Sequence, residues 1–587
     1  MSLDRIQVLK FGSSVLPSAA HLHVAVHEIY RHLRVGKKVI AVTSAIGDTT
    51  DRLLKQARVI AKQQNEEAIA ELLATGEAEA VALLKLALAK AGIAANALSA
   101  HNLGLQTDGP LLDANPVQLD LQPLLQKLQQ RSVLIVPGFV GKHADDRLSL
   151  LGRGGSDLTA LVIAQALKHG NPQSPTCRLL KDVAGLYEWD PAADGPPPRR
   201  FSSIGFEEAT AVGGAVLQPK AVQYAQRQQL NFELGQCSST VTTLVGQVGT
   251  ELENSAPTSA PLKVALIGLG TVGHGVYSLL GKHADKFELV QVVVANPHKP
   301  RDLNPPCSIL KNELDLSAQP DVIIEVAGCS AHLSETLLQA LALGIPVLTA
   351  DKELVANQLN ALAPYLNSRT PILRCSAAVA GIVPALEGVG RIAAVDGVQQ
   401  LQGVLNGTSN FILQQMADGH SFHQALQQAQ ELGYAESDPS ADIYGWDAAR
   451  KLSLLIHRAW GVQLPPERIP SQGIAALTST EVGPNLRLVA KAYRHADGRI
   501  SASVQPTELP KDHVLLQANG VGNAVLIEDS LLQSHLLLGD GAGRWPTAEA
   551  VFADLLDVWR LHAKSDFAAT LPTSKPSAEC LAREASA

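Results

Sequence analysis

The sequence predicts an α/β fold, with short apolar strands and amphipathic helices alternating along most of the chain. Two segments carry this prediction: Ile6–Phe11 and Leu262–Ile267 have the length and composition of buried strands, and each runs directly into a turn of small residues. The third observation is length, because 587 residues are too many for a single hydrophobic core. We therefore expect an N-terminal α/β sandwich with a largely parallel sheet, followed by at least one further α/β domain.

Composition narrows the functional class. Hydrophobic residues make up 46% of the chain and charged residues 18%, which is typical of a soluble globular protein. The net charge of −8 argues against a nucleic acid or another large polyanion as partner. The six cysteines show no Cys-x-x-Cys spacing, so we expect neither a structural zinc site nor a disulfide framework. No signal peptide and no apolar run of about 18 residues is present, so we expect a cytoplasmic enzyme without a membrane span.

The first half contains several turns suited to anions. Gly12-Ser13-Ser14 follows the first strand, and such a turn lets backbone N–H groups approach a phosphate closely, although a plain strand-ending turn explains it equally well. Lys37–Ser44 and Val133–Gly141 are predicted as further strands. Thr75-Gly76-Glu77 is predicted to lead into a helix, and the glycine-rich Gly152–Thr159 to open another helix, whose N-terminus favours an anion.

These pieces together resemble aspartokinases of the amino-acid kinase family over residues 1–246. The stretch LGRGGSDLTA is the most specific match, and SAIGDTTD and Gly76-Glu77 also match. The resemblance implies phosphorylation of aspartate by ATP with Mg²⁺, a reaction that needs positioning and charge neutralisation above all. It implies that the phosphoryl group is cradled by Lys10, Gly12, Ser13 and Ser14, that aspartate is held by Thr50, Glu77, Arg153 and Asp157, and that Asp182 helps at the nucleotide side.

This half departs from the family pattern at three positions. Ser13 replaces a glycine, Ala184 replaces an acid, and Ala215 stands where a nucleotide-contacting lysine is expected. A serine in the place of Ser13 is also found in the related glutamate kinases, so only the changes at Ala184 and Ala215 favour the alternative, which is an inactive kinase fold that serves as a binding or dimerisation module.

Residues 247–261 have no apolar periodicity and read as a short flexible connector. In aspartokinases a pair of small regulatory domains usually occupies this place, and this segment is too short to contain them. We expect feedback inhibition by threonine or lysine to be absent or greatly weakened, which assays of both activities with millimolar threonine and lysine would test.

The second half opens with a dinucleotide-binding pattern. Leu262–Ile267 is followed by a Gly-x-Gly-x-x-Gly turn and a predicted helix, an arrangement typical of a Rossmann domain with the pyrophosphate at the helix N-terminus. The predicted cofactor-binding residues are Gly268, Gly270, Thr271, Val272 and Gly273. After the next strand, Glu288–Ala295, Asn296 stands where an NAD enzyme often has an acid, and Lys299 and Arg301 could meet a 2′-phosphate. This favours NADP and leaves NAD open.

The most informative stretch is Gly433–Lys451, which concentrates Glu436, Asp438, Asp442, Asp447 and Lys451. Pro439 and Gly445 interrupt any helix before Trp446, after which the apolar spacing predicts an amphipathic helix. Asp447 and Lys451 share one face of it. In isolation this spacing is typical of a surface ion pair worth only about 0.3–0.5 kcal/mol.

The same stretch resembles the signature of homoserine dehydrogenases nearly residue for residue. The resemblance implies that Lys451 transfers the proton, that Asp447 sits beside the reacting oxygen, and that Glu436 and Asp442 hold the substrate. It makes Lys352, at the end of the predicted strand Pro346–Lys352, a second active-site lysine and brings Gly407 and Thr408 to the substrate, although a helix N-cap at Thr408 or Ser409 is compatible with that role. Ser376 falls where an acid of the family's monovalent-cation loop is expected, so no metal ligand is assigned with certainty.

We therefore predict a bifunctional enzyme that phosphorylates aspartate and reduces aspartate semialdehyde to homoserine, serving threonine, methionine and lysine biosynthesis. A homodimer is expected because the dehydrogenase family is usually dimeric. A wholly non-catalytic sensor of amino acids or nucleotides is a further alternative. The expected parts are a kinase-like domain (1–246), the connector (247–261), a Rossmann domain (262–395), an α+β substrate and dimerisation domain (396–545), a returning helix (546–565) and a tail (566–587).

Overall fold

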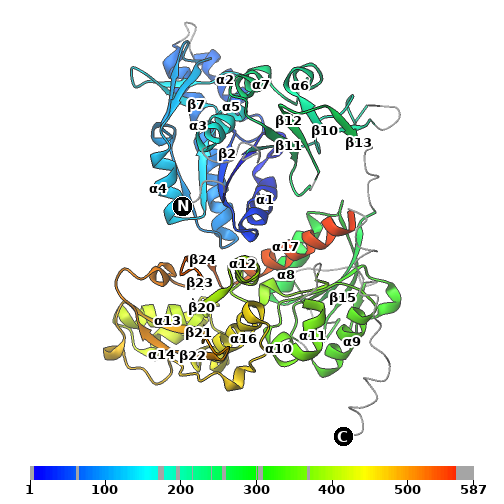
Figure 1. Ribbon diagram of the computed structural model, residues 1–587, viewed down its shortest axis with the longest axis vertical. Coiled ribbons are helices and arrows are strands. Elements are labelled where there is room, and N and C mark those ends of the chain that lie inside the picture. The colour runs from blue at the N-terminus through cyan, green and yellow to red at the C-terminus, as the bar shows by residue number, and fades with distance from the viewer. Residues whose placement is uncertain are drawn as a thin grey trace. The chain divides into compact units, whose positions relative to one another are not determined.

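The computed structural model forms two compact units (Figure 1). The first unit comprises Met1–Thr258 and Val379–Glu549, and the second comprises Ser259–Ala378 and Ala550–Ala587. The structure describes residues 5–60, 65–168, 177–193, 198–214, 216–239, 241–253, 260–298, 301, 309–328, 330–366, 371–541 and 543–563. The predicted tail (566–587), the last two residues of the predicted returning helix (564–565), Lys299 and Ala215 lie outside these residues.

A nine-stranded sheet organises the N-terminal part of the first unit. Its order is β13-β10-β12-β11-β9-β1-β2-β6-β3, and all neighbours are parallel except β11 with β12 and β10 with β13. The sheet is thus largely parallel, as predicted. The strands are β1 (Ile6–Phe11), β2 (Lys38–Thr43), β3 (Ala95–Ala97), β6 (Val133–Pro137), β9 (Cys177–Lys181), β10 (Arg200–Gly205), β11 (Phe232–Gln236), β12 (Thr242–Gly246) and β13 (Glu251–Glu253).

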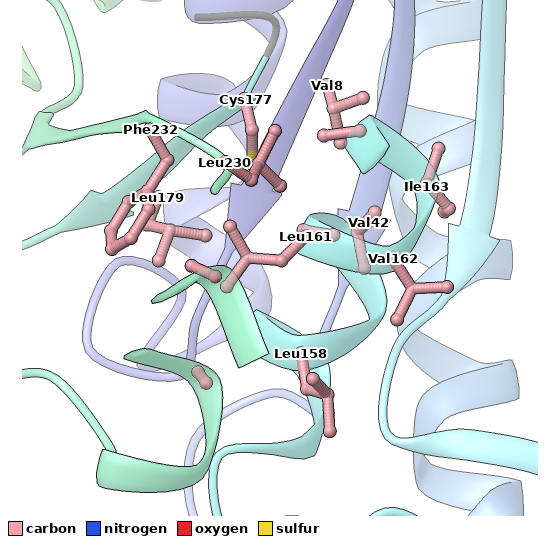
Figure 2. Packing of buried hydrophobic residues seen from close by; sticks show 14 of the residues in the cluster. Val8, Val42, Leu158, Leu161, Val162, Ile163, Cys177, Leu179, Leu230 and Phe232 are labelled. Atoms are coloured by element: carbon pink, nitrogen blue, oxygen red, sulfur yellow. The ribbon is translucent and has the colours of Figure 1, made fainter. Parts of the chain in front are cut away.

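Helices cover this sheet, and α5 is the one buried most completely. Figure 2 shows Leu161 and Val162 of α5 among Val8, Val42 and Leu179 of the strands. Because α5 is apolar on nearly every face, it forms the centre of the core rather than an outer layer. The helices are α1 (Leu22–Arg34), α2 (Thr49–Ile60), α3 (Glu66–Lys90), α4 (Gln122–Gln130), α5 (Gly155–Leu167), α6 (Phe206–Val212) and α7 (Pro219–Arg227).

Three local predictions for this part are wrong. The predicted strand Val133–Gly141 is divided, because Phe139 adopts a positive φ of 68° and turns the chain into β7 (Val140–His143) of a separate sheet with β4 (Leu105–Asp108), β5 (Asn115–Leu119) and β8 (Leu148–Leu150). Gly76 and Glu77 lie in the middle of α3 rather than before a helix, since α2 approaches closely there: a Cβ on Gly76 would be 3.1 Å from Thr49 Cγ2. The predicted connector contributes β13, whose backbone pairing with β10 needs no apolar pattern.

The C-terminal part of the first unit is an antiparallel five-stranded sheet in the order β22-β21-β20-β23-β24. One finding differs from the sequence prediction: Pro439 and Gly445 bracket a single helical turn, α15, instead of a helix-free loop. The strands are β20 (Val398–Val404), β21 (Leu486–Arg494), β22 (Ile500–Glu508), β23 (Gly522–Asp529) and β24 (Ser534–Asp540), and the helices are α12 (Ala385–Val395), α13 (Gly407–Ala417), α14 (Phe422–Glu431), α15 (Ser440–Ile443) and α16 (Trp446–Trp460).

The second unit is built on a parallel six-stranded sheet in the order β16-β15-β14-β17-β18-β19. The predicted strand Pro346–Lys352 is shorter than expected, because Asp351 caps α10 and Lys352 is the first residue of that helix. The strands are β14 (Leu262–Ile267), β15 (Phe287–Val293), β16 (Leu310–Lys311), β17 (Val322–Glu325), β18 (Val347–Thr349) and β19 (Leu373–Arg374), with helices α8 (Thr271–Gly281), α9 (Ala331–Ala342), α10 (Lys352–Asn357), α11 (Leu359–Leu366) and α17 (Arg544–Ala563), the last from Ala550 onward.

None of the helices in the described part of the chain combines the length and apolarity that crossing a lipid bilayer requires.

Candidate active sites

Helix α16 carries a buried ion pair at the position the sequence singled out. Gly445 and Gly461 adopt positive φ values of 80° and 67° and delimit the helix, which residues with a side chain rarely do. Within it, Lys451 Nζ lies 2.7 Å from Asp447 Oδ2. Asp447 is 1% exposed and Lys451 8% exposed. The pair is therefore not a surface contact, and its burial is costly unless further polar groups complete it.

Asn406 forms one of the hydrogen bonds that stabilise this buried ion pair. Its Nδ2 donates to Asp442 Oδ1 at 2.6 Å and to Asp447 Oδ2 at 2.7 Å. Its Oδ1 accepts from the backbone N–H of Ser409 at 2.7 Å, so Asn406 caps α13. The predicted cap at Thr408 or Ser409 is wrong, because the helix already begins at Gly407 and its cap is the residue before. One amide thus joins the start of α13 to two carboxylates of the signature stretch.

The backbone at the end of β20 orients the lysine. Lys451 Nζ donates to the carbonyl oxygen of Leu405 at 2.7 Å, and Asn523 Nδ2 donates to the same oxygen at 3.2 Å. Three segments distant in sequence therefore meet at the ammonium group, which rigid partners hold in a defined position.

The other predicted substrate-binding residues of this part differ in burial and in the element that carries them. Gly407 and Thr408 form the first turn of α13, and Thr408 Oγ1 donates to the carbonyl oxygen of Tyr434 at 2.7 Å. Asp442 is half-buried in α15, whereas Glu436 is exposed on the preceding loop. The structure brings Asp442, Asp447 and Lys451 into one hydrogen-bonded cluster.

The N-terminal part of the first unit contains a pocket of about 530 Å³ at the ends of β1 and β9. The structure brings together there most of the residues predicted from the kinase resemblance, namely Lys10, Ser13, Thr50, Glu77, Arg153 and Asp157. Gly12, Ser14 and Asp182 are not among the lining residues but are adjacent in the chain to Ser13 and Lys181, which are, and Asp182 is exposed. Lys181, which the sequence did not single out, lines the pocket.

Two lysines neutralise one carboxylate in this pocket. Lys10 Nζ lies 2.8 Å from Asp157 Oδ1, and Lys181 Nζ lies 2.9 Å from Asp157 Oδ2. Burial alone would raise the pKa of Asp157, but the two ammonium groups outweigh it and hold this pKa below its ordinary value. Burial lowers the pKa of Lys181, and the neighbouring charge of Lys10 lowers it further. Two cations at one acid leave an excess positive charge, which suits a phosphoryl group.

Glu77 is the least satisfied group in the pocket. Its side chain is 2% exposed, and Oε2 has no hydrogen-bond partner among the described residues. Burial raises its pKa to about 8, against the opposing effects of the Ala45 backbone and the charge of Lys10. A buried carboxylate oxygen without a donor is costly, and an ammonium group of a ligand would satisfy it.

The glycine turn of the second unit has the geometry of a dinucleotide-binding loop. Gly268 adopts a φ of +95°, and a Cβ there would lie 2.8 Å from Ala327 Cα. A Cβ on Gly273 would lie 2.1 Å from the carbonyl oxygen of Gly268, so the turn packs too tightly for side chains at both positions. Gly270 is exposed and caps α8, and Thr271 and Val272 form the first turn of that helix. The loop therefore fits a pyrophosphate at the helix N-terminus.

Glu325 stabilises the turn that packs against this loop. It is fully buried at the end of β17 and accepts hydrogen bonds from the backbone N–H groups of Ala327 at 2.7 Å and Gly328 at 2.9 Å. Thr349 Oγ1 donates to its other oxygen at 2.5 Å. Burial raises the pKa of Glu325. Its three partners fix the Ala327–Gly328 turn against which Gly268 packs.

The other predicted residues of this unit lie outside the glycine turn in the sequence. Lys352 is half-buried at the start of α10. Asn296 is exposed after β15, and Arg301 Nη2 donates to its carbonyl oxygen at 2.7 Å. Ser376 Oγ donates to Asp554 Oδ1 at 2.8 Å. In the part of the chain that the structure describes, no group of three or more His, Cys, Asp or Glu residues has the arrangement of a metal site.

Sequence reasoning missed four residues of these sites: Asn406, Asn523, Lys181 and Glu325. Three of them had a usable signal. Lys181 and Glu325 are each the last residue of a buried strand, and Asn406 stands between a strand and a helix, where an N-cap is favoured. Asn523 lies inside β23, and nothing in its local pattern separates it from structural residues.

Comparisons with known proteins identify the domains in which these sites lie. The model of the amino acid kinase family matches residues 5–232, that of the homoserine dehydrogenase NAD-binding domain matches 268–369, and that of homoserine dehydrogenase matches 384–556. A homoserine dehydrogenase of Pseudomonas aeruginosa is 35% identical over 322 residues, covering 51% of this chain and 73% of that protein. One from Neisseria gonorrhoeae is 32% identical, covering 53% and 75%.

Among solved structures, a homoserine dehydrogenase from Thiobacillus denitrificans aligns with 34% identity and a TM-score of 0.48, covering 53% of this chain and 76% of that one. The two homoserine dehydrogenase models together match the Rossmann and α+β parts, and the kinase model matches the part that precedes them. The chain belongs to the homoserine dehydrogenase family and carries an amino acid kinase domain ahead of its NAD-binding and dehydrogenase domains.

Proposed function

We propose that Lys451 is the proton-transfer residue in the reduction of aspartate semialdehyde to homoserine. The observation that supports this role is the buried ammonium group held by Asp447 and the Leu405 carbonyl oxygen, both at 2.7 Å. A lysine acts as a proton donor when its surroundings fix its position and adjust its acidity.

A bound NADPH or NADH would supply the hydride. As negative charge develops on the carbonyl oxygen of the substrate, Lys451 donates a proton to it, and Asp447 stabilises the ammonium before transfer. Asn406 bridges the two carboxylates Asp442 and Asp447 by donating to both, which offsets part of their mutual repulsion. We assign Asp442, Glu436, Gly407 and Thr408 to substrate binding, and Lys352 to the cofactor side.

For the kinase domain we propose phosphorylation of the side-chain carboxylate of aspartate by Mg²⁺-ATP. Lys10 and Lys181 would offset the charge of the transferred phosphoryl group, Glu77 would accept from the ammonium of aspartate, and Arg153 would bind a carboxylate through two of its guanidinium nitrogens. The excess positive charge at Asp157 and the unsatisfied oxygen of Glu77 support this assignment.

Replacing Lys451 with alanine tests the dehydrogenase assignment. We expect kcat for NADPH-dependent reduction to fall by roughly 10²–10⁴-fold, the usual contribution of general acid catalysis. NADPH binding, followed by nucleotide fluorescence, should remain within about twofold, because Lys451 is assigned to the proton rather than the cofactor. The exposed Lys491 provides a matched control, and Lys491→Ala should leave kcat unchanged. Turnover of Lys451→Ala close to that of the unaltered protein would refute the role.

Aspartate-dependent formation of a hydroxamate with ATP tests the kinase assignment. Product should appear with the full chain and disappear in Lys10→Ala, since that change removes one of two cations at Asp157. No product from the full chain would favour an inactive kinase fold that binds ligands or promotes dimerisation.

We also propose a homodimer located in the cytoplasm. Light scattering of the purified chain measures the oligomeric state, and the mass of a single copy would contradict the homodimer.

A further inference from the structure

A second cleft in the first unit is not used by either active site. It has a volume of about 640 Å³. Its walls are the α1–β2 turn at Gly36–Lys38, the α4–β6 turn at Gln129–Ser132, the start of α12 and strand β24. The kinase domain and the α+β part of the dehydrogenase therefore line it together, both within the same compact unit.

The charged residues that line this cleft are all basic. They are Arg5, Lys37, Lys38, Arg131, Arg391 and, when protonated, His535. No aspartate or glutamate is among the described lining residues. The cations come from five separate segments of a chain whose net charge is −8, so their convergence is not a consequence of overall composition.

Three carboxylates outside the lining act on these cations. Glu387 acts on Arg391 but is ion-paired with Arg34 at 2.7 Å, and Glu233 acts on Lys37 but is ion-paired with Arg178 at 2.6 Å. Asp529 pairs with His535 itself at 2.9 Å, which leaves Arg131, Arg391 and the two lysines without an ion-paired carboxylate of their own among the described residues. The lysine contacts are to neutral groups, since Lys37 Nζ donates to Gln7 Oε1 at 2.7 Å and Lys38 Nζ donates to the Leu128 carbonyl oxygen.

Arg391 is half-buried in this cleft and lies within electrostatic reach of a second cation, Arg5. The guanidinium of Arg391 lies over Gly36, where a Cβ would come within 2.3 Å of its Cζ, and its Nη1 donates to the Arg34 carbonyl oxygen at 3.2 Å. Burial lowers the pKa of Arg391, and the charge of Arg5 lowers it further. Burial likewise lowers the pKa of Lys37 and of Lys38. Like charges held close together are costly, and a bound anion would remove that cost.

We propose that this cleft binds a small phosphate-bearing molecule with at least two negative charges. Several convergent cations exceed what a single carboxylate requires, and guanidinium and ammonium groups together match phosphate oxygens. The apolar side chains of Val133, Ile382 and Leu537 also line the cleft, so there is room beside the charges for the organic part of a phosphate ester.

Calorimetric titration of the full chain with pyrophosphate at low ionic strength tests the proposal. We expect saturable binding that weakens at least about tenfold in the double variant Arg131→Gln/Arg391→Gln, because charge-assisted hydrogen bonds are lost. The exposed Arg227 gives a matched control, and Arg227→Gln should bind normally. Lys10→Ala should retain this binding, which separates the cleft from the kinase pocket and from the proposed kinase activity.

Unchanged binding in the double variant, or complete loss in Lys10→Ala, would overturn the proposal, as would the absence of binding at millimolar pyrophosphate. Tighter binding of citrate than of pyrophosphate would overturn the phosphate assignment. A second measurement needs no variant: pyrophosphate should slow modification of Lys37 and Lys38 by an amine-reactive reagent several-fold, while Lys168 reacts at its former rate. Equal rates at all three lysines would also overturn it.

Discussion

Asn406 Nδ2 donates to Asp447 Oδ2 at 2.7 Å and so joins the start of α13 to the first turn of α16. The same nitrogen reaches Asp442 at 2.6 Å. The acids that flank the proposed proton donor are therefore positioned by a residue without an ionisable group. Because Asn406 does not titrate, its own hydrogen-bonding capacity should not change with pH.

Asn406→Ala should destabilise the protein and impair the dehydrogenase. Loss of a helix cap costs about 1 kcal/mol, and loss of hydrogen bonds to charged groups adds more, so the free energy of unfolding should fall by about 2–4 kcal/mol. Ser421 caps α14 on the surface and provides a control. Ser421→Ala should cost only about 1 kcal/mol and leave kcat unchanged. Equal effects of the two changes in urea unfolding and steady-state assays would contradict the prediction.

Gly473→Ala should disturb the substrate side of the same cluster. A Cβ at this position would lie 2.0 Å from the carbonyl oxygen of Ile443 and 2.4 Å from Tyr444 Cα, both backbone atoms that cannot rotate away. Helix α15, which carries Asp442, would have to shift, and we expect kcat/KM to fall at least about tenfold. A Cβ added at Gly281 would meet no packing partner within 4 Å, so Gly281→Ala is the control. An undiminished kcat/KM in Gly473→Ala would show that α15 does not position the substrate.

Lys181→Ala should reduce the kinase reaction, although no sequence motif pointed to this residue. Its ammonium lies 2.9 Å from Asp157 and shares that carboxylate with Lys10. Removing one cation where phosphoryl charge develops should lower kcat by roughly 10²-fold. Lys168, at the end of α5, is a control outside the pocket, and Lys168→Ala should keep full activity. Hydroxamate assays of both variants measure the difference, and similar rates would exclude a role for Lys181.

Glu77 should make the stability of the kinase domain depend on pH. Burial raises its pKa in the folded state to about 8, above its ordinary value of 4.5. Between these two values the folded state retains a proton that the unfolded state has lost, so stability falls as pH rises, by up to about 1.4 kcal/mol per pH unit. Melting temperatures at pH 5 and pH 8 should therefore differ more for the unaltered chain than for Glu77→Gln.

Aspartate provides a second test at the same residue. Its ammonium group would stabilise ionised Glu77, so binding below pH 8 should release a proton, measurable as a dependence of the binding heat on buffer. Equal pH dependence in the two proteins, or proton release that persists in Glu77→Gln, would show that another group titrates.

The α/β class, the mostly parallel first sheet and the glycine turn at Gly268 could be predicted from local sequence patterns, and the signature stretch pointed to Asp442, Asp447 and Lys451, which lie together in the folded chain. Strand and helix periodicity, and turns that only small residues can form, are local properties and can be read along the chain. Predictions of individual strands and helices were wrong where tertiary packing outweighed local sequence preference. Phe139 turns the chain between two sheets, and Gly76 lies inside a helix.

Local sequence patterns did not predict which polar groups meet in the folded chain. Lys451 and Asn523 converge on the Leu405 carbonyl oxygen, and Arg131 and Arg391 line one cleft, although the members of each pair lie far apart in the sequence. The physical reason is that the free energy of a buried charge depends on neighbours brought near by folding, not on adjacent residues in the chain.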